Sequence, residues 1–278
     1  MTDRRTITLA HSPDADDAFM FYALARDRID TAEFRFEHHL KDIQSLNIDA
    51  LEERFDVTAI SFAMYPRVAD HYALLSSGAS IGDGYGPIVV ANEPLDIPAL
   101  ASKVIAVPGI NTSAYLALKL FLPSAQTEVL HFDEIQPAVR EGRFRAGVLI
   151  HEGQLTWQDE GLHKVVDLGE WWKGKTGLPL PLGGNTIRRK LGEERIRRIS
   201  AILRQSIQYS LDHRDEALDY ALGFGRGLPR ERADRFVGMY VNEMTLDYGE
   251  RGRAAVRRFL DDAANEGLVG RVESLEFY

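Results

Sequence analysis

A histidine follows one of the predicted strands of this chain. His151, with Glu152 after it, comes directly after the apolar run 147–150, which has the length and composition of a buried strand. α/β proteins bind ligands outside the carboxyl ends of such strands, and a histidine exchanges a proton near neutral pH with little tuning. His151 is therefore a candidate general base. The same position also suits a histidine that only hydrogen-bonds a loop carbonyl.

Hydroxyl and amide side chains accompany two other predicted strands. Thr112 and Ser113 open a predicted helix directly after one of them. One hydroxyl there can cap the helix, while the other and the free N–H groups can hold a carboxylate. Ser61 follows the strand 57–60, and Asn47 lies on the helix before it, so both are candidate substrate contacts, against a more common structural role. No G-x-S-x-G motif surrounds Ser61, which argues against a serine nucleophile.

The remaining motifs indicate neither a metal nor a cofactor. The chain has no cysteine, and its eight histidines show no metal-binding spacing. His38 and His39 are adjacent on a predicted strand, so their side chains point to opposite faces. The G-x-G-x-G run at 82–86 leads into a strand rather than a helix, which indicates a tight turn instead of a dinucleotide loop. Trp171 and Trp172 fit either a stacking site for an aromatic ligand or the core between two lobes.

The elements that must position these residues alternate between strand and helix, which predicts an α/β fold with largely parallel sheets. Ser12 is expected to cap the first helix. A loop rich in Gly, Pro and Trp is expected at 169–184, and the chain reads as helical from Gly192 onward. The predicted strands are 6–10, 33–40, 57–62, 88–91, 104–107 and 146–150, and the predicted helices before residue 169 are 14–25, 42–51, 112–122 and 137–143.

This order of elements predicts two lobes. Lobe one is expected to contain residues 1–92 and, with a helical C-terminal tail, residues 185–278; lobe two is expected at 95–182. The crossings between them are expected near 86–95 and 178–186. A small ligand is expected to bind in the cleft between the lobes.

The composition argues against several classes of protein. The chain has 278 residues, with 33 Lys and Arg against 42 Asp and Glu, for a formal net charge of −9. This acidic balance argues against a nucleic-acid-binding protein and against docking on anionic membranes. No segment approaches the run of about 20 apolar residues that a membrane span needs. Polar residues interrupt the first apolar stretch after residue 10, so no secretory leader is predicted and a cytoplasmic location is expected.

Five stretches, in order over nearly the whole chain, form one recognisable set: residues 11–22, 106–109 with 112–115, 146–152, 171–172 with 176–185, and 240–242 with 247–249. Together they resemble the 1,4-dihydroxy-6-naphthoate synthases of the futalosine-dependent route to menaquinone. The resemblance implies two α/β lobes like those of type II periplasmic binding proteins. It also implies an enzyme that needs no cofactor. The implied lyase reaction converts cyclic dehypoxanthine futalosine, a small-molecule carboxylate, into 1,4-dihydroxy-6-naphthoate and dihydroxyacetone.

The resemblance also implies roles for particular residues. It makes His151 the proton acceptor and Asn47 and Asp17 polar residues of the cleft. It implies two substrate-binding stretches: Ala59, Ile60 and Ser61, and Thr112, Ser113 and Ala114.

The first motif departs from the pattern of many members of that family. Where they carry Cys, Pro, Asn and Thr, this chain carries Asp14, Ala15, Asp16 and Ala18. No direct substrate contact is therefore carried over to Asp16 or Ala18.

Three alternatives stay open on the sequence. A chorismate dehydratase of the same pathway has a similar fold, but the stretches 150–152 and 171–185 favour the naphthoate synthase. A solute-binding protein would bind an aromatic carboxylate reversibly and would carry a leader. A regulator with this fold would bind tightly without turnover. The sequence makes no prediction of the oligomeric state.

Overall fold

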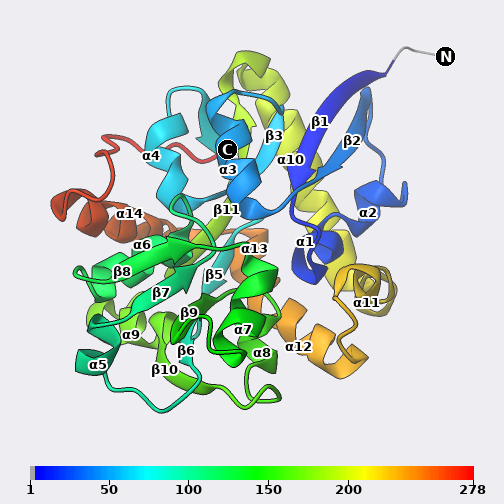
Figure 1. The fold of residues 1–278 in the computed structure, drawn as a ribbon. Helices are drawn as coiled ribbons and strands as arrows, with labels where there is room; N and C mark the ends of the chain where they lie inside the picture. The colour runs from blue at the N-terminus through cyan, green and yellow to red at the C-terminus, as the bar shows by residue number, and fades with distance from the viewer. Residues whose placement is uncertain (1–3) are drawn as a thin grey trace.

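The strands form two sheets, one in each of two lobes (Figure 1). The computed structural model describes residues 4–278. The first sheet, in lobe one, contains β1 (Arg5–His11), β2 (Phe34–Leu40), β3 (Val57–Ser61), β4 (Tyr72–Leu74), β5 (Ser80–Gly82) and β11 (Leu180–Arg188). Its order is β2-β1-β3-β11-β4, and β5 also pairs with β11.

The second sheet, in lobe two, contains β6 (Ile88–Ala91), β7 (Val104–Val107), β8 (Gln126–Val129), β9 (Ala146–Leu149) and β10 (His163–Asp167). Its order is β10-β6-β9-β7-β8. β1 is parallel to β2 and β3, and β7 is parallel to β8 and β9. The strands that follow the crossings, β6 and β11, pair antiparallel with their neighbours. Both sheets are therefore mixed, and the prediction of largely parallel sheets is wrong for these strands.

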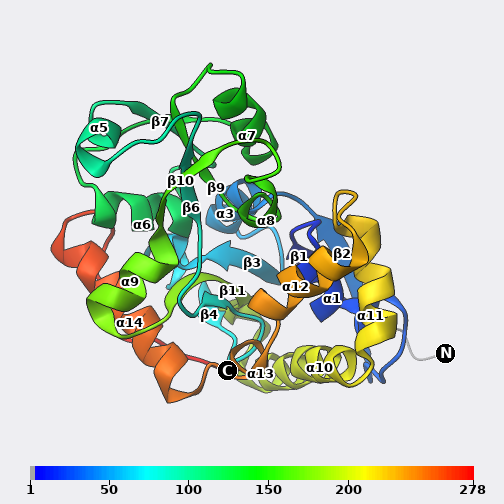
Figure 2. The same ribbon diagram turned by 90° about the horizontal axis from the view of Figure 1, so that it is seen from below.

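Helices cover both sheets, and the C-terminal tail wraps around lobe one (Figure 2). Lobe two carries α5 (Ile97–Ala101), α6 (Ser113–Phe121), α7 (Phe132–Arg140), α8 (Gly153–Thr156) and α9 (Leu168–Thr176). Lobe one carries α1 (Ala15–Met20), α2 (Tyr22–Ala25), α3 (Ile43–Leu51), η1 (Phe62–Met64) and α4 (Tyr65–Val68). The tail contains η2 (Arg189–Leu191), α10 (Glu193–Asp212), α11 (Arg214–Ala221), η3 (Leu222–Phe224), α12 (Arg230–Tyr240), α13 (Glu243–Leu246) and α14 (Gly249–Asn265). Within residues 4–278, every helix is too short or too polar to cross a membrane.

The lobe boundaries differ from the expected ones at both crossings. β6 pairs with β9 and β10, so residues 88–91 lie in the second sheet and not in a lobe one that ends at 92. β11 begins at Leu180 in the first sheet, so lobe two does not extend to 182. We propose that lobe two comprises residues 88–176, with the crossings at 83–87 and 177–179. The glycine run at the first crossing does form a close-approach turn, because a Cβ on Gly82 would lie 2.0 Å from the Tyr85 carbonyl oxygen.

The segment expected as a loop at 169–184 contains a helix and a strand instead. Asp167 begins α9 by accepting hydrogen bonds from the N–H groups of Gly169 and Glu170. Gly177 ends the helix in the left-handed conformation, at a φ of 73°. The sequence did not indicate this helix, because its Gly and Trp residues suggested a loop. Its buried apolar side consists mainly of Leu168 and the large ring of Trp172, so it shows little helical periodicity.

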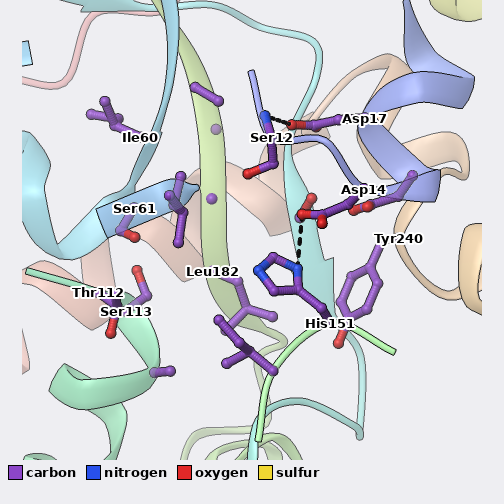
Figure 3. A pocket seen from close by; sticks show the side chains of 18 of the residues that line it. Ser12, Asp14, Asp17, Ile60, Ser61, Thr112, Ser113, His151, Leu182 and Tyr240 are labelled. Atoms are coloured by element: carbon purple, nitrogen blue, oxygen red, sulfur yellow. Dashed lines mark hydrogen bonds and ion pairs between the residues drawn. The ribbon is translucent and has the colours of Figure 1, made fainter. Parts of the chain in front are cut away.

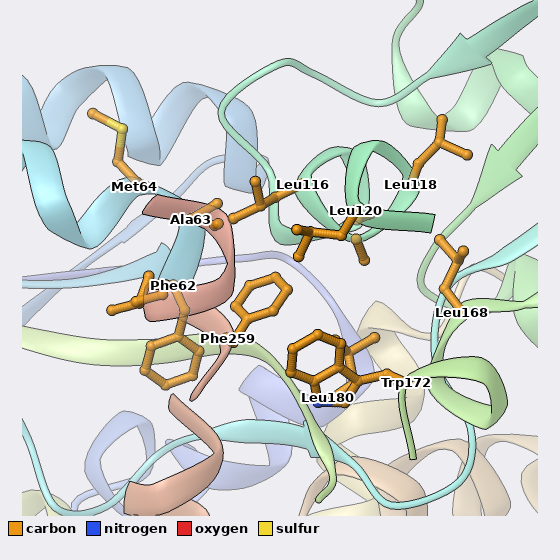
Figure 4. Close-up of a cluster of buried hydrophobic side chains, with 14 of the residues drawn as sticks. Phe62, Ala63, Met64, Leu116, Leu118, Leu120, Leu168, Trp172, Leu180 and Phe259 are labelled. Atoms are coloured by element: carbon orange, nitrogen blue, oxygen red, sulfur yellow. The ribbon is translucent and has the colours of Figure 1, made fainter. Parts of the chain in front are cut away.

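An apolar core joins the two lobes on the side of α6, α9 and α14 (Figure 4). Trp172 is fully buried there, with its ring edge-on to Phe259 of α14 at 5.4 Å and its Nε1–H donating to the Pro179 carbonyl. Leucines of α6 and Phe62 of η1 complete the cluster. Trp171 packs against Phe121, and neither tryptophan lines the ligand cavity described below. Of the two interpretations of the tryptophan pair, the core between the lobes is the one observed.

Candidate active site

A cavity lies between the lobes at the ends of several strands (Figure 3). Lobe one contributes the segment between β1 and α1, the end of β3, the middle of β11 and one side of α12. Lobe two contributes the start of α6 and the segment after β9. The polar residues of the wall are Ser12, Asp14, Asp16, Asp17, Ser61, Ser80, Thr112, Ser113, His151, Gln154, Asn185 and Tyr240.

Seven of the eight predicted substrate-binding residues and the predicted base line this cavity: Asp17, Ala59, Ile60, Ser61, Thr112, Ser113, Ala114 and His151. The exception is Asn47, which lies fully buried behind Ser61 and does not reach the cavity. Its Oδ1 accepts from the Ser61 N–H at 2.8 Å, and its Nδ2 donates to the Ser61 hydroxyl and the Asn111 carbonyl. The expectation that Asn47 is a cleft contact is therefore corrected: it holds Ser61 and the α6 loop in place.

The two hydroxyl groups at the start of α6, those of Thr112 and Ser113, make different contacts. The Thr112 hydroxyl caps the helix, accepting from the Tyr115 N–H at 3.1 Å and donating to the Gly109 carbonyl. The Ser113 hydroxyl accepts from the Ala63 N–H of lobe one at 3.2 Å. The N–H groups of Ser113 and Ala114 lie in the first turn, where a helix offers no internal acceptor. This wall can therefore bind an anionic group.

His151 faces the α6 start from the other side of the cavity. Its backbone is left-handed, with a φ of 52°, which turns the side chain inward after β9. Its Nδ1 lies 3.0 Å from Oδ2 of Asp14. Its Nε2 has no hydrogen-bond partner among residues 4–278 and lies on the side of the ring toward Ser61, Thr112 and Ser113 (Figure 3).

Asp14 belongs to the other lobe, and its carboxylate is 2% exposed. Its Oδ1 accepts from Arg226 at 2.7 Å. Burial alone would raise the pKa of Asp14, but the facing His151 and Arg226 outweigh it and lower that pKa to about 2. Burial alone would lower the pKa of His151, but Asp14 outweighs it and raises that pKa to about 9. At neutral pH the two groups therefore form an ion pair in the free protein.

Two further carboxyls of the first motif lie beside this pair. Burial and the neighbouring Asp14 raise the pKa of Asp16 to about 7. Burial and Asp16 raise the pKa of Asp17 well above its usual range. Asp17 accepts from the Ser12 N–H at 2.7 Å. Ser12 does not cap the first helix as expected, because that helix begins at Ala15 with Asp14 before it.

Sequence reasoning missed the partners of His151 and the α12 wall. In the first motif, Asp14 was noted only because it differs from the residue that many members of the resembled family carry. No sequence spacing indicated that it would pair with His151, which lies 137 positions later. Tyr240 and the stretch 182–185 belonged to the recognised set of motifs, which was a usable signal for this wall. No sequence pattern identified Arg226 as a residue of the site. Residues 4–278 contain no group of three or more His, Asp or Glu side chains arranged to hold a metal ion.

The chain matches known proteins over nearly its whole length. The family model described as menaquinone biosynthesis matches residues 7–265. Two relatives are named 1,4-dihydroxy-6-naphthoate synthase. The one from Thermus thermophilus is 42% identical and covers 95% of this chain and 96% of its own length. The one from Streptomyces coelicolor is 39% identical and covers 95% of each.

Solved structures agree with the two-lobe fold. A crystal structure of an Archaeoglobus fulgidus protein has a TM-score of 0.91 at 45% identity, covering 95% of this chain and 98% of that one. The alkanesulfonate-binding protein SsuA from Xanthomonas axonopodis pv. citri has a TM-score of 0.72 at 10% identity, covering 98% and 96%, and shares the fold alone. The predicted periplasmic-binding-protein-like fold is therefore confirmed. By its match to the family model and to two close relatives, this chain belongs to the menaquinone biosynthesis family.

Proposed function

We propose that this protein is a 1,4-dihydroxy-6-naphthoate synthase, a lyase that converts cyclic dehypoxanthine futalosine into 1,4-dihydroxy-6-naphthoate and dihydroxyacetone. The observation that carries the proposal is that His151, whose buried Nε2 has no hydrogen-bond partner among residues 4–278, lines the same cavity between the lobes as the start of α6. The names of the two relatives support the choice of product, 1,4-dihydroxy-6-naphthoate.

The charges of the two walls give the substrate one orientation. Asp14 is ionised, so a carboxylate on the lobe-one side would meet a like charge. The α6 start offers N–H groups and the Ser113 hydroxyl instead. The substrate carboxylate therefore binds at Thr112–Ala114, and the sugar-derived carbons lie near His151.

The reaction then needs one base and a dry cleft. Nε2 of His151 removes a proton from the cyclised substrate, a carbon–carbon bond breaks, and dihydroxyacetone leaves as the remaining ring system becomes aromatic. The imidazolium that forms lies against the Asp14 carboxylate, which stabilises its charge. The two lobes exclude water from the cavity and strengthen this interaction.

The test is an assay of the purified protein with cyclic dehypoxanthine futalosine, following the naphthoate chromophore, with chorismate assayed in parallel. We expect naphthoate from the first substrate and no reaction with chorismate. Because the base must be neutral and its pKa is raised to about 9, kcat/KM should increase from pH 7 toward pH 9.

His151→Asn tests the base, since asparagine tolerates the left-handed backbone at this position. We expect kcat to fall by about 100-fold or more while the naphthoate product still binds. The matched control is His163→Asn, an exposed histidine of β10, which should retain the wild-type rate. No naphthoate from the wild-type protein would refute the function, and a wild-type rate for His151→Asn would remove His151 from the mechanism.

A further inference from the structure

The two sides of the lobe interface differ in chemistry. On the side of α6, α9 and α14 the lobes share a fully buried apolar core. On the opposite side, where α12 lies (Figure 2), they meet through polar contacts. There the Tyr240 hydroxyl donates to Oε1 of Gln154 at 2.6 Å, and Arg232 pairs with Asp159. Apolar contacts of a core cannot be exchanged for water at low cost, whereas an exposed ion pair such as Arg232–Asp159 can. The cleft can therefore open on the α12 side, and the buried ion pairs of Asp14 and Glu152 are the contacts that resist this opening.

Arg226 is the central contact on that side. It lies between η3 and α12, in a tail segment that packs on α1 of lobe one. Its guanidinium donates to Oδ1 of Asp14 in lobe one and pairs with Oε2 of Glu152 in lobe two. It also lies 3.4 Å from Asp133 and 4.9 Å from the centre of the Phe132 ring, both on α7 of lobe two. One side chain thus connects both lobes next to the base.

The base and the carboxylate that orients it lie in different lobes. His151 follows β9 of lobe two, and its carboxylate partner Asp14 precedes α1 of lobe one. The 3.0 Å contact between them exists only while the α12 side is closed. When that side opens, the imidazole loses the carboxylate that orients it, and Arg226 is separated from Glu152.

We propose that Asp14 and Arg226 are positioning residues for the reaction: Arg226 holds the α12 side of the cleft closed, and closure brings Asp14 to Nδ1 of His151, so that the base is oriented only while the cleft is closed. This inference rests on the proposed function. The neutral ring in the closed state has its proton on Nδ1, bonded to Asp14, and its Nε2 lone pair directed into the cavity.

Other charged and titratable groups also face His151. Glu152 adjoins it, Asp16 approaches from α1 and Tyr240 from α12, while α7 offers the Phe132 ring at 4.8 Å. Removal of Asp14 takes away the group that does most to raise the pKa of His151, and removal of Arg226 separates the two groups by opening the cleft. Both changes should therefore lower the pKa of His151, with the larger effect from the loss of Asp14.

The first experiment is NMR titration of the histidine side chains without substrate, with His151 assigned from the His151→Asn variant. Asp14→Asn should lower the pKa of His151 by about two pH units or more. Arg226→Gln should lower it by less, because the cleft then opens and the contact with Asp14 is lost in part of the molecules. The pH profile of kcat/KM should follow: Asp14→Asn moves its midpoint to lower pH and lowers the plateau about ten-fold or more, because a correctly oriented base is lost. Arg226→Lys should restore most of the rate lost in Arg226→Gln.

The second experiment measures closure directly. The chain has no cysteine, so Glu128→Cys on lobe two and Glu194→Cys on lobe one provide two unique sites for spin labels. Arg226→Gln should broaden the distance distribution between these labels when no ligand is present. Arg230→Gln is the matched control, since Arg230 pairs only with Asp215 and Asp219 within the tail. This measurement keeps the test valid even where Asp14→Asn fails to fold.

An unmoved His151 titration in Asp14→Asn, or an unchanged distance distribution in Arg226→Gln, overturns the inference. A wild-type protein that makes no naphthoate but shows the expected titration shifts refutes the proposed function and leaves the pairing of Asp14 with His151 supported.

Discussion

Two helix starts face each other across the cleft, and they differ in almost every chemical respect. The acidic start, residues 14–17, follows β1 of lobe one; the hydroxyl start, residues 112–114, follows β7 of lobe two. At the hydroxyl start, Thr112 caps its helix in the ordinary way. At the acidic start, Asp14 occupies the cap position but bonds to His151 and Arg226 instead of to its helix.

The comparison shows how one topological position can serve opposite purposes. The hydroxyl start satisfies its own cap and keeps N–H groups for a ligand. The acidic start leaves its cap to the backbone and uses the Asp14 carboxylate to hold two cationic groups. Under the proposed function, the substrate carboxylate therefore binds at the hydroxyl start. The four predictions below test this difference, in order of decreasing effect.

A negative charge at the hydroxyl start should abolish the chemical difference between the two helix starts. Ser113→Asp should weaken binding of 1,4-dihydroxy-6-naphthoate by about 100-fold, because two carboxylates would then lie within a few ångströms in a poorly solvated cleft. An acidic residue in a first helical turn stabilises the helix, so the fold should be retained. Calorimetry under anaerobic conditions measures the affinity. Ser113→Ala is the control and should lose only a few-fold; equal affinities for the two variants would contradict the assignment.

Neutralising the acidic start should change stability in a pH-dependent way. Asp16 has a pKa of about 7 in the folded protein, above its unfolded value, so its ionisation destabilises the fold progressively as pH rises from about 4 to 7. Asp16→Asn removes this penalty and should increase the free energy of unfolding by about 2 kcal/mol more at pH 8 than at pH 4.5.

Asp14→Asn should have the opposite sign at pH 8. The pKa of Asp14 lies below its unfolded value, so its charge stabilises the fold at every pH above about 4, and this stabilisation is lost only as pH falls toward 2. Urea denaturation at the two pH values measures both variants. Two variants that change stability in the same direction would show that Asp14 and Asp16 do not differ as described.

Removing the ordinary cap should have the smallest effect. Thr112→Ala should lower the free energy of unfolding by about 1 kcal/mol, the usual cost of losing an N-cap oxygen. Ser12→Ala should lower it by less than about 0.5 kcal/mol, because the Ser12 side chain does not cap α1. Urea denaturation of both variants at neutral pH is sufficient, and equal losses would mean that the two helix starts are capped alike.

Features that depend on neighbours in the sequence were predictable. The run before His151 and the residues around Thr112 define their own strand and helix, so both were expected at the cleft and both line it. The antiparallel pairing of β6 and β11 was not predictable, because periodicity gives the conformation of a strand and not its partner. Asn47 was misassigned for a similar reason: a polar residue on a helix can face a ligand or a backbone, and only packing decides which.

Contacts between residues far apart in the chain could not be predicted from the sequence. Asp14 and Arg226 are 212 positions apart, and the contact between them depends on how the C-terminal tail returns to lobe one. An Asp-rich helix start ordinarily serves its own helix dipole. The Asp14 carboxylate instead contacts Arg226 of the tail and His151 of lobe two.

The shared core around Trp172 and Phe259 has a consequence for how the molecule is organised. Lobe one is made of two separate stretches of chain, and the second of them, in α14, supplies one side of the contact with Trp172 of lobe two. A fragment limited to either lobe would expose a broad apolar surface to solvent. Excision or grafting of a single lobe would therefore yield an aggregation-prone piece rather than an autonomous module, and the two halves are best regarded as one cooperative unit.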